Sequence, residues 1–391
     1  GFNLRTRSGR ELTYSPQHRF LVYQDRPGID RSWQSKLRKK NAPVWVRGHE
    51  LKVGDRVPLS AYAFDGKDGL DADDAYVIGL YVAEGSWHNR HVLVDGTKRY
   101  YGVQIGNNDG SITATLEAWA TQHGFPYRRY DNKHIFGSGS GSWMWQFCDT
   151  TDKAATKKVP RQILGADIAT KAAFIAGLFD GDACAEPKWG LLIFRTKSDQ
   201  LAHEVQMLLD SMGVVSTRRK FIQTGTYNGS VEMNELSVSG QWVNHLQELA
   251  PFQRLKHVQG RPGYNTTKLR RGYNDWVFDP IMSIEPATAH FMDITTEGED
   301  HTFAPNGIVT GQSMWMGMGA FKVMSAGAKA KDYAKRYGSC IMFIDEIDSI
   351  AASRGGVQGG GAMNPMVGMM GGGGLGVLTR LLSLMDGLED H

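Results

Sequence analysis

Two apolar segments that lie far apart in the chain nearly repeat each other, and this repeat constrains the fold more than any other sequence feature. The segments are residues 77–85 (VIGLYVAEG) and residues 175–183 (IAGLFDGDA). Gly79 and Ala83 are four positions apart and therefore lie on one face of a predicted helix. Gly177 and Gly181 have the same spacing in the second segment. Because glycine inside a helix costs about 0.5–1 kcal/mol relative to alanine, its presence in both segments indicates two helix backbones that must approach closely.

Each segment carries an acid near its end, Glu84 in the first and Asp182 in the second. If the predicted helices cross at their small residues, the two carboxylates come to lie side by side. Two facing carboxylates form a site for a hard divalent cation such as Mg²⁺. The pattern resembles the LAGLIDADG homing endonucleases, with both copies on one chain. The alternative is a pair of glycine-containing core helices that hold no site.

The resemblance implies an enzyme that hydrolyses phosphodiester bonds of double-stranded DNA with Mg²⁺ as cofactor. Glu84 and Asp182 are then both the metal ligands and catalytic residues. A family segment with a lysine before an apolar residue and proline matches residues 157–160 (KKVP), and we assign the lysine to Lys158, which positions water or stabilises charge. The alternative for Lys158 is a solvated lysine before a turn. Asp180 faces differently from Asp182 and is expected to cap or pack.

After each acidic segment the sequence repeats the order of strands, a helix and basic strands. The resemblance implies an α+β fold, a pseudo-symmetric two-repeat endonuclease with the order αββαββα in each half and a saddle of antiparallel sheet with a basic concave face. Arg and Lys on strands neutralise phosphates and reach base edges in the major groove. Taken singly, each such residue could be an ordinary surface charge. The candidate DNA-binding residues are Arg128, Arg129, Lys133, Arg195, Lys197, Arg218 and Lys220.

The two flanks of this region consist of short predicted strands and turns, and they resemble an intein, a protein-splicing element in which an endonuclease is commonly nested. Residues 15–18 (SPQH) resemble the family's Thr-x-x-His segment, and residues 291–309 resemble its two terminal segments. The resemblance implies that the amide side chain of the terminal residue attacks its own backbone carbonyl at the downstream junction. Neighbouring groups assist by transferring protons. The residues assigned to splicing are Ser15, His18, Asp293, His301, Gln312 and Ser313.

Three departures from the intein pattern bear on activity. Gln312 stands where asparagine is usual and must close a six-membered ring, which we expect to be slower. Gly311 replaces the usual penultimate histidine, so His301 would substitute. The upstream nucleophile segment is absent, so the chain is expected to begin inside the splicing domain and to complete no splicing alone. An unrelated small β-domain is the alternative for these flanks.

The segment after Gln312 resembles a fragment of an AAA ATPase that hosts the insertion. Residues 340–348 (CIMFIDEID) resemble a Walker B strand, in which Asp345 would hold Mg²⁺ and Glu346 would activate water. Trp315 matches the aromatic residue of a pore loop. A generic buried strand followed by acids is the alternative. No G-x-x-x-x-G-K-[ST] sequence occurs in the chain, so we do not expect this fragment to bind nucleotide.

These inferences combine into one organisation for the 391 residues. An incomplete all-β Hint splicing domain is interrupted by the endonuclease and followed by an α/β AAA fragment. The expected boundaries are 1–65 and 271–312 for the splicing domain, 66–270 for the endonuclease and 313–391 for the host fragment. The expected partners are the host gene's empty insertion site and the missing N-terminal segment.

Bulk properties fit this organisation without proving it. The formal net charge of +3 does not by itself indicate nucleic acid, so the local basic clusters must do so. The three cysteines have no zinc spacing and fit a reducing, cytoplasmic location without membrane contact. Two rival functions remain open, a catalytically decayed DNA-binding remnant and the ATP hydrolysis of the host protein.

Overall fold

The computed structural model forms two compact units, Gly1–Gln312 and Ser313–His391. The second unit is described only at Tyr333, Gly338 and Ser339. The expectations for Ser313, Trp315, Asp345 and Glu346 therefore lie outside the described residues. In the first unit the described residues are 1–23, 43–60, 65–66, 68–92, 98–148, 153–226, 229–261, 270–271, 277–291, 294 and 302–311.

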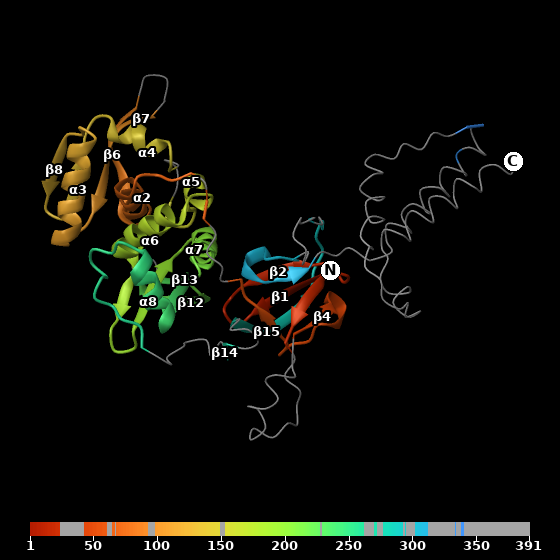
Figure 1. Cartoon of the computed structure of the whole chain (residues 1–391). Helices are drawn as coiled ribbons and strands as arrows, with labels where there is room; N and C mark the ends of the chain where they lie inside the picture. The colour runs from red at the N-terminus through yellow and green to blue at the C-terminus, as the bar shows by residue number, and fades with distance from the viewer. Residues whose placement is uncertain are drawn as a thin grey trace, which may run out of the picture. The chain divides into compact units, whose positions relative to one another are not determined.

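Two buried helices form the centre of the first unit. Helices α2 (Ala72–Glu84) and α6 (Ile168–Asp182) lie side by side where two halves meet (Figure 1). Each begins at an aspartate that accepts a backbone N–H of the first turn, Asp71 from Asp73 and Asp167 from Thr170. Nearly every later residue of both helices is buried, which is why their sequences are apolar around the whole circumference.

The helix backbones touch at the glycines of the repeated segments. A Cβ atom on Gly79 would fall on the carbonyl oxygen of Phe174, and one on Gly177 would fall on the carbonyl oxygen of Tyr76. Further along, a Cβ on Gly181 would lie 2.5 Å from the Cβ of Ala83. The small residues are therefore required by the close approach of the two backbones, and this approach places the two helix ends next to each other.

Each central helix is followed by the same series of elements. The first half contains β6 (Gly85–Val92), β7 (Lys98–Gly106), α3 (Gly110–Gln122), β8 (Tyr127–Tyr130), β9 (Lys133–Phe136) and α4 (Ser140–Trp145). The second half contains β10 (Cys184–Glu186), β11 (Leu191–Thr196), α7 (Asp199–Ser211), β12 (Ser216–Thr226), β13 (Gly229–Ser239) and α8 (Gln241–Leu249). The antiparallel sheets have matching orders, β6-β7-β9-β8 and β10-β11-β13-β12. A short helix, α5 (Arg161–Leu164), precedes α6.

One hydrophobic core joins both halves. It contains the apolar faces of both sheets together with α2 and α6, and Phe179 of α6 stacks on Phe194 of β11 with ring centroids 5.5 Å apart. Helices α3 and α7 cover the same face of their sheets through Trp119 and the row that includes Val205 and Leu209. The opposite face of each sheet is left uncovered by these helices, and alternation along the strands decides which side chains reach it.

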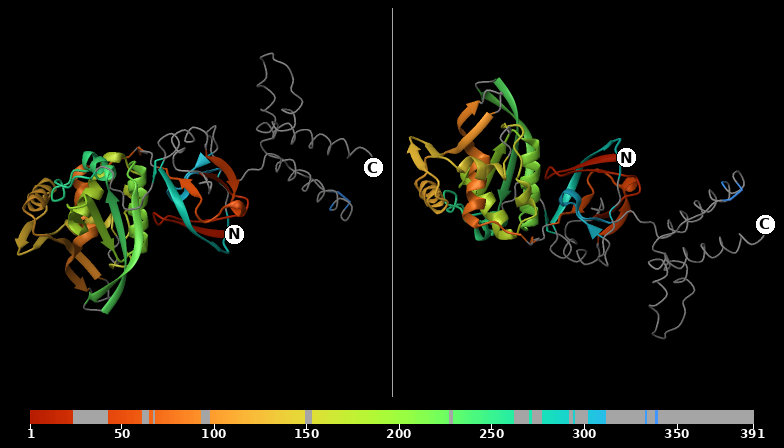
Figure 2. Two further views of the ribbon diagram at one scale, coloured as in Figure 1. Left: turned by 90° about the horizontal axis from the view of Figure 1, so that it is seen from below. Right: turned by 90° about the horizontal axis from the view of Figure 1, so that it is seen from above.

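The N-terminal and C-terminal segments of the first unit fold together. They supply β1 (Phe2–Thr6), β2 (Glu11–Tyr14), β3 (Arg19–Val22), β4 (Val44–Arg47), η2 (Gly48–Glu50), β5 (Arg56–Pro58), β14 (Arg270–Arg271), β15 (Val277–Pro286), β16 (Thr302–Phe303), η4 (Pro305–Gly307) and β17 (Thr310–Gly311). Strand β1 pairs with β15, and β3 pairs with β17. Both views of Figure 2 show the red N-terminal strands beside the cyan strands from the other flank. The two flanks thus build one β-rich part around a separate core that includes Leu4, Phe20 and Ile281.

A buried charged cluster links this β-rich part to α7. Arg10, only 1% exposed, donates its Nε to Asp210 at 3.2 Å and pairs with the same carboxylate through Nη2. Burial raises the pKa of Asp210 to about 6, although the charge of Arg10 acts in the opposite direction. Gln206 of α7 adds a bond to the carbonyl oxygen of Ser8 at 3.1 Å. Within the described residues, no helix has the length and apolar character needed to cross a membrane.

Candidate active site

Glu84 and Asp182 are the last residues of α2 and α6, and the crossing of these helices brings them together. Both residues reach solvent, yet the crowded helix ends around them remove part of their hydration. This desolvation raises the pKa of both carboxyls. The nearby charge of Asp182 raises the pKa of Glu84 further, which shows that the two carboxylates repel each other. A cation placed between them would relieve that repulsion.

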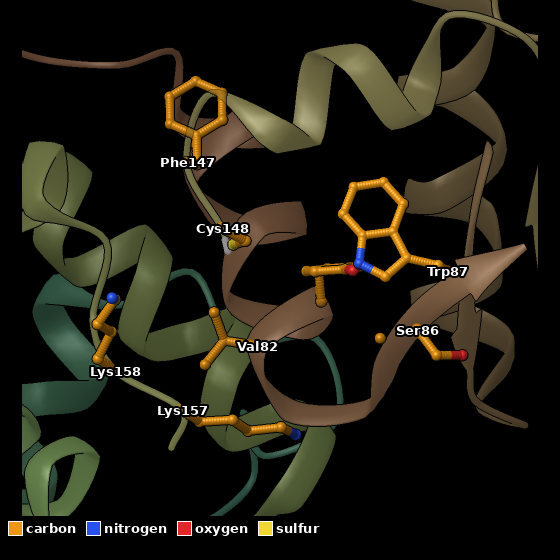
Figure 3. A pocket seen from close by; sticks show the side chains of 9 residues that line it. Val82, Ser86, Trp87, Phe147, Cys148, Lys157 and Lys158 are labelled. Carbon is orange, nitrogen blue, oxygen red and sulfur yellow. The ribbon is translucent and has the colours of Figure 1, made fainter. Parts of the chain in front are cut away.

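Lys157, not Lys158, is the lysine at this acid pair. The Nζ of Lys157 donates to the carbonyl oxygen of Ala83, and its charge lowers the pKa of both Glu84 and Asp182. Lys158 is exposed, and Figure 3 shows the two lysine side chains diverging from the extended segment. The expectation that Lys158 lies at the acid pair is therefore corrected: the structure places its neighbour there.

The physical reason for this correction is the alternation of side chains along extended backbone. The segment is held by Ser198, whose Oγ donates to the carbonyl oxygen of Lys157 at 2.5 Å, and by Glu204, whose Oε2 accepts the N–H of Val159 at 2.7 Å. Val159 is buried, which fixes the rotation of the segment. Only one of two consecutive lysines can then point toward the acids.

Arg254 is a second cation at the site, and sequence reasoning missed it. Its Nε donates to the carbonyl oxygen of Asp180 at 2.6 Å, and its Nη2 donates to that of Phe179 at 2.9 Å and to that of Ala183. It therefore binds carbonyl groups at the C-terminal end of α6, where helical partners run out, and shares the carbonyl oxygen of Phe179 with the N–H of Ala183. Its charge also lowers the pKa of both acids. A signal for Arg254 was available in the repeat: it follows α8, the last helix of the second half, as Lys157 follows α4, the last helix of the first half.

Asp180 has a structural role, in agreement with its predicted orientation away from Asp182. It is fully buried and accepts the hydroxyl of Tyr76 at 2.8 Å. It also accepts the backbone N–H groups of Gln253 and Leu255 at 2.6 and 3.0 Å. Asp180 thereby ties the segment that carries Arg254 to the end of α6.

We expect Asp180→Ala to lower the free energy of unfolding by about 2–3 kcal/mol, because the Tyr76 hydroxyl and two backbone N–H groups lose this acceptor. Chemical denaturation measures this loss. Asp180→Asn keeps one acceptor oxygen and a similar volume, so a smaller loss is expected. If Asp180→Ala unfolds at the same denaturant concentration as the unchanged chain, this anchoring role is wrong.

A small cavity of about 130 Å³ adjoins the end of α2. Trp87, Phe147, Cys148 and Lys157 are among its lining residues, as Figure 3 shows. The cavity lies directly next to the acid pair through Gly85 and Lys157. It provides room for a group that approaches the site from the side of the first half.

The donor set at the helix ends fits a magnesium ion that the substrate helps to coordinate. The described residues contain no cluster of three or more His, Cys, Asp or Glu side chains that could enclose a metal. Mg²⁺ is commonly held by one or two carboxylates, with waters and substrate phosphates as the remaining ligands. Glu84 and Asp182 meet that requirement, and the charge of Asp182 raises the pKa of Glu84.

In the first half, the uncovered sheet face carries two of the three basic candidates. Strand register pairs Arg128 with Ile135 and Lys133 with Tyr130, which places them on one face. Arg129 pairs with His134, which is buried on the α3 side of the sheet. The expectation that Arg129 lies on the open face is therefore wrong.

In the second half, alternation again separates the candidates. Arg195 is exposed on the open face, and Lys197 is exposed directly after β11. Arg218 and Lys220 lie on the α7 side, where Arg218 donates to the carbonyl oxygen of Gly9 at 2.9 Å and Lys220 pairs with Asp199 at 2.9 Å. The expectation that Arg218 and Lys220 lie on the open sheet face is therefore corrected.

Arg219, which was not among the candidates, lies on the open face between Arg218 and Lys220. The errors arise in runs of consecutive basic residues, where neighbouring side chains of one strand point to opposite faces. In the run 218–220 the middle side chain lies on the open face, and in the pair 128–129 the first side chain lies there.

Of the splicing candidates, Ser15 and His18 lie within the described residues. They occupy the turn between β2 and β3, where the N–H of His18 donates to the carbonyl oxygen of Ser15 at 3.0 Å. The His18 ring packs edge-on against Phe20 and Phe303, so it contacts both flanks. The remaining candidates, Asp293, His301, Gln312 and Ser313, lie outside the described residues.

Comparison with known proteins finds a similarity between part of the chain and one family model. Residues 169–249 match the LAGLIDADG-like domain. The matched segment begins in α6 and ends in α8, so it covers the second half. A solved structure of the homing endonuclease I-DmoI in complex with DNA and Ca has 15% identity and a TM-score of 0.33, covering 46% of this chain and 93% of that chain.

The curated relatives have different named activities. DNA-directed RNA polymerase subunit Rpo1C of Methanocaldococcus jannaschii is 27% identical over 258 residues, 56% of this chain and 27% of that protein. The DNA gyrase A subunit of Mycolicibacterium flavescens is 25% identical over 235 residues, 56% and 38% of the two chains. The alpha subunit NrdEB of ribonucleoside-diphosphate reductase from Bacillus subtilis is 22% identical over 353 residues, which cover 79% of this chain and 30% of that protein. The chain thus spans less than half the length of each of these proteins.

Proposed function

We propose that this chain is a LAGLIDADG-type site-specific DNA endonuclease carried within a protein-splicing element. The observation that carries the proposal is the juxtaposition of Glu84 and Asp182 at the ends of two helices in glycine-mediated contact. Each half also supplies one cation to this pair, Lys157 or Arg254. The family match over the second half supports the same reading.

The named activities of the relatives support an inserted element. An RNA polymerase, a gyrase and a reductase share no reaction, yet each has a partial match to this chain. A segment common to such proteins is explained by an element that resides in different hosts. The pairing of both flanks in the same sheets supports a splicing domain into which the nuclease is inserted.

In the proposed reaction, Glu84 and Asp182 would hold Mg²⁺ at the junction of the halves. The bound ion would polarise a DNA phosphate and activate a water for hydrolysis. Lys157 and Arg254 offset the negative charge that the carboxylates and the phosphate bring together. Arg128, Lys133, Arg195, Lys197 and Arg219 contribute positive charge on or beside the open sheet faces for the duplex.

We expect Lys157→Met to reduce the rate of DNA cleavage about 100-fold, in the range seen when one charge-stabilising group is removed. Because Lys157 lowers the pKa of Glu84 and Asp182, its loss raises those pKa values further. The carboxylates must be ionised to bind metal, so the acidic limb of the pH–rate profile should move to higher pH. Rates across pH at saturating Mg²⁺ measure both effects.

Lys158→Met is the matched control, because it removes the same charge one residue away on the exposed side. It should leave the rate and the pH profile unchanged. Equal losses in the two variants would contradict the assignment of Lys157.

The finer organisation is part of the same proposal. Residues 1–65 and 271–312 form the splicing domain, 66–270 form the endonuclease, and 313–391 belong to an AAA ATPase host. In this domain Ser15 and His18 serve the upstream junction, while Asp293, His301, Gln312 and Ser313 serve the downstream one.

The test is incubation of the purified chain with plasmid carrying the uninterrupted junction of the host gene, first with Mg²⁺ and then with EDTA. Linearisation that requires Mg²⁺ supports the nuclease. Retarded but intact DNA favours a decayed nuclease that still binds. ATP binding by the chain, without either DNA result, would favour the function of the host.

A further inference from the structure

A carboxylate lies at the centre of the basic open face of the second half. Glu235 of β13 is only 6% exposed and stands between Arg195 of β11 and Arg219 of β12. Its Oε2 accepts Nε and Nη2 of Arg195 at 3.0 and 2.8 Å. Its Oε1 accepts Nε of Arg219 at 2.7 Å and contacts Nη2 at 2.6 Å.

This arrangement is unfavourable for simple attraction to phosphate. The buried negative charge of Glu235 cancels one of the two arginine charges, so a surface selected only for general DNA affinity would omit it. Both arginines nevertheless remain accessible, with 44% of the Arg195 side chain and 72% of the Arg219 side chain exposed. The contribution of Glu235 must therefore be to the orientation of the two guanidinium groups and not to the affinity for phosphate.

Glu235 fixes the orientation of both guanidinium planes. Each arginine uses its Nε–Nη2 edge on one carboxylate oxygen, so the terminal Nη1–Nη2 edge of each is left for another acceptor pair. Arg195 is restrained a second time, because its guanidinium lies 5.6 Å from the ring centroid of Phe221. Two guanidinium groups of fixed orientation, on the two strands adjacent to β13, thus flank a single carboxylate.

We propose that Glu235 orients Arg195 and Arg219 to read two guanines on neighbouring base pairs of the target duplex. The O6 and N7 atoms of guanine present an acceptor pair in the major groove that matches the terminal edge of arginine. Because both guanidinium groups bind one carboxylate, they lie too close together to contact distant base pairs. This inference rests on the proposed function, and Glu235 is a positioning residue rather than a catalytic one.

Replacing Glu235 by glutamine separates affinity from specificity. The change adds one net positive charge to the face, so binding to arbitrary duplex DNA should become tighter at low salt, with the salt dependence steeper by up to about one unit of log–log slope. The preference for the two guanines should fall, since one arginine–guanine pair discriminates by roughly 5- to 150-fold. Tighter general binding with weaker discrimination is a result that loss of folding would not produce.

Glu232→Gln is the matched control. This substitution removes the same charge from the same strand. The Glu232 side chain, however, faces the α7 side, where its Oε1 lies 3.4 Å from the Nζ of Lys220. The substitution should reproduce a change in general affinity and leave base preference unaltered. Thermal unfolding of both variants checks that the sheet remains intact.

The experiment uses the full chain in EDTA, so that DNA is bound and not cut. A preferred site is recovered from a randomised duplex pool, and each of its guanines is then replaced singly by 7-deazaguanine, which lacks the N7 acceptor. Two neighbouring guanines should each be required, Arg195→Met and Arg219→Met should each lose dependence on one of them, and Glu235→Gln should weaken dependence on both.

Full retention of the guanine preference in Glu235→Gln, or a selected site without neighbouring guanines, overturns the inference while leaving the proposed function intact. Failure of the unchanged chain to bind any duplex overturns the proposed function, and this inference with it.

Discussion

Replacing Glu84 by glutamine and Asp182 by asparagine is expected to lower Mg²⁺-dependent cleavage of duplex DNA by at least about 1,000-fold while DNA binding persists. The amides keep the size of the carboxyl groups but remove the negative charges that hold the metal. The positive residues on the open sheet faces are untouched, so a gel shift with the same DNA should remain. Cleavage of plasmid carrying the insertion junction, compared with the gel shift, measures the separation of the two activities.

The same double variant should be at least as stable as the unchanged chain. Desolvation raises the pKa of Glu84 and of Asp182, and the charge of Asp182 adds to the effect on Glu84. A raised carboxyl pKa means that the folded state disfavours the ionised form, so this contribution destabilises the fold as pH rises through the folded pKa values. Neutral amides remove that contribution at neutral pH, where thermal unfolding shows it.

Asp73→Asn provides the control, because this acid is exposed at the opposite end of α2. It should change neither cleavage nor stability appreciably. Cleavage at an unchanged rate in the Glu84/Asp182 variant would show that the acid pair does not perform the chemistry. Loss of the gel shift together with cleavage would instead indicate that the pair is needed for binding.

Gly177→Ala is expected to reduce the free energy of unfolding by about 4 kcal/mol, above the typical cost of overpacking, which is about 1–3 kcal/mol. The added Cβ would fall on the carbonyl oxygen of Tyr76 and would also lie 3.0 Å from the backbone nitrogen of Leu80. Both are backbone atoms of α2, so no side chain can rotate away and the two helices must separate. Chemical denaturation gives the loss of stability, and cleavage should fall with it because separation moves Asp182 away from Glu84.

Gly110→Ala is the matched substitution in a helix that has space. Gly110 begins α3, and nothing lies within 4 Å of its added Cβ. Alanine is favoured over glycine inside a helix, so this variant should be neutral or slightly more stable. If Gly177→Ala is equally well tolerated, the close contact between α2 and α6 is wrong.

Sequence reasoning succeeded where a local pattern has one structural solution. The four-residue spacing of small residues predicted the contact face of each central helix, and the structure places Gly79 and Gly177 against the backbone of the opposite helix. The ends of α7 follow equally local rules: Ser198 accepts the N–H of Leu201 at its start, and Gly213 after its end has a φ of +77°.

It failed where a choice between neighbouring residues depends on strand register or on a distant segment. Lys157 and Lys158 are chemically identical, and only the buried anchor at Val159 decides which one reaches the acids. Arg254 comes to the site through hydrogen bonds to the end of α6, far away in the sequence. No local pattern contains that information.

The sequence by itself determined the two acidic helices, the repeated order of elements and the types of residue available for chemistry, because hydrophobic periodicity, capping and glycine spacing act over a few residues. Only the tertiary structure decided which basic side chains share the open face, which lysine accompanies Glu84 and Asp182, and that Glu235 joins Arg195 to Arg219. These are relations between strands and segments brought together by packing, and a change of one residue in register reverses them.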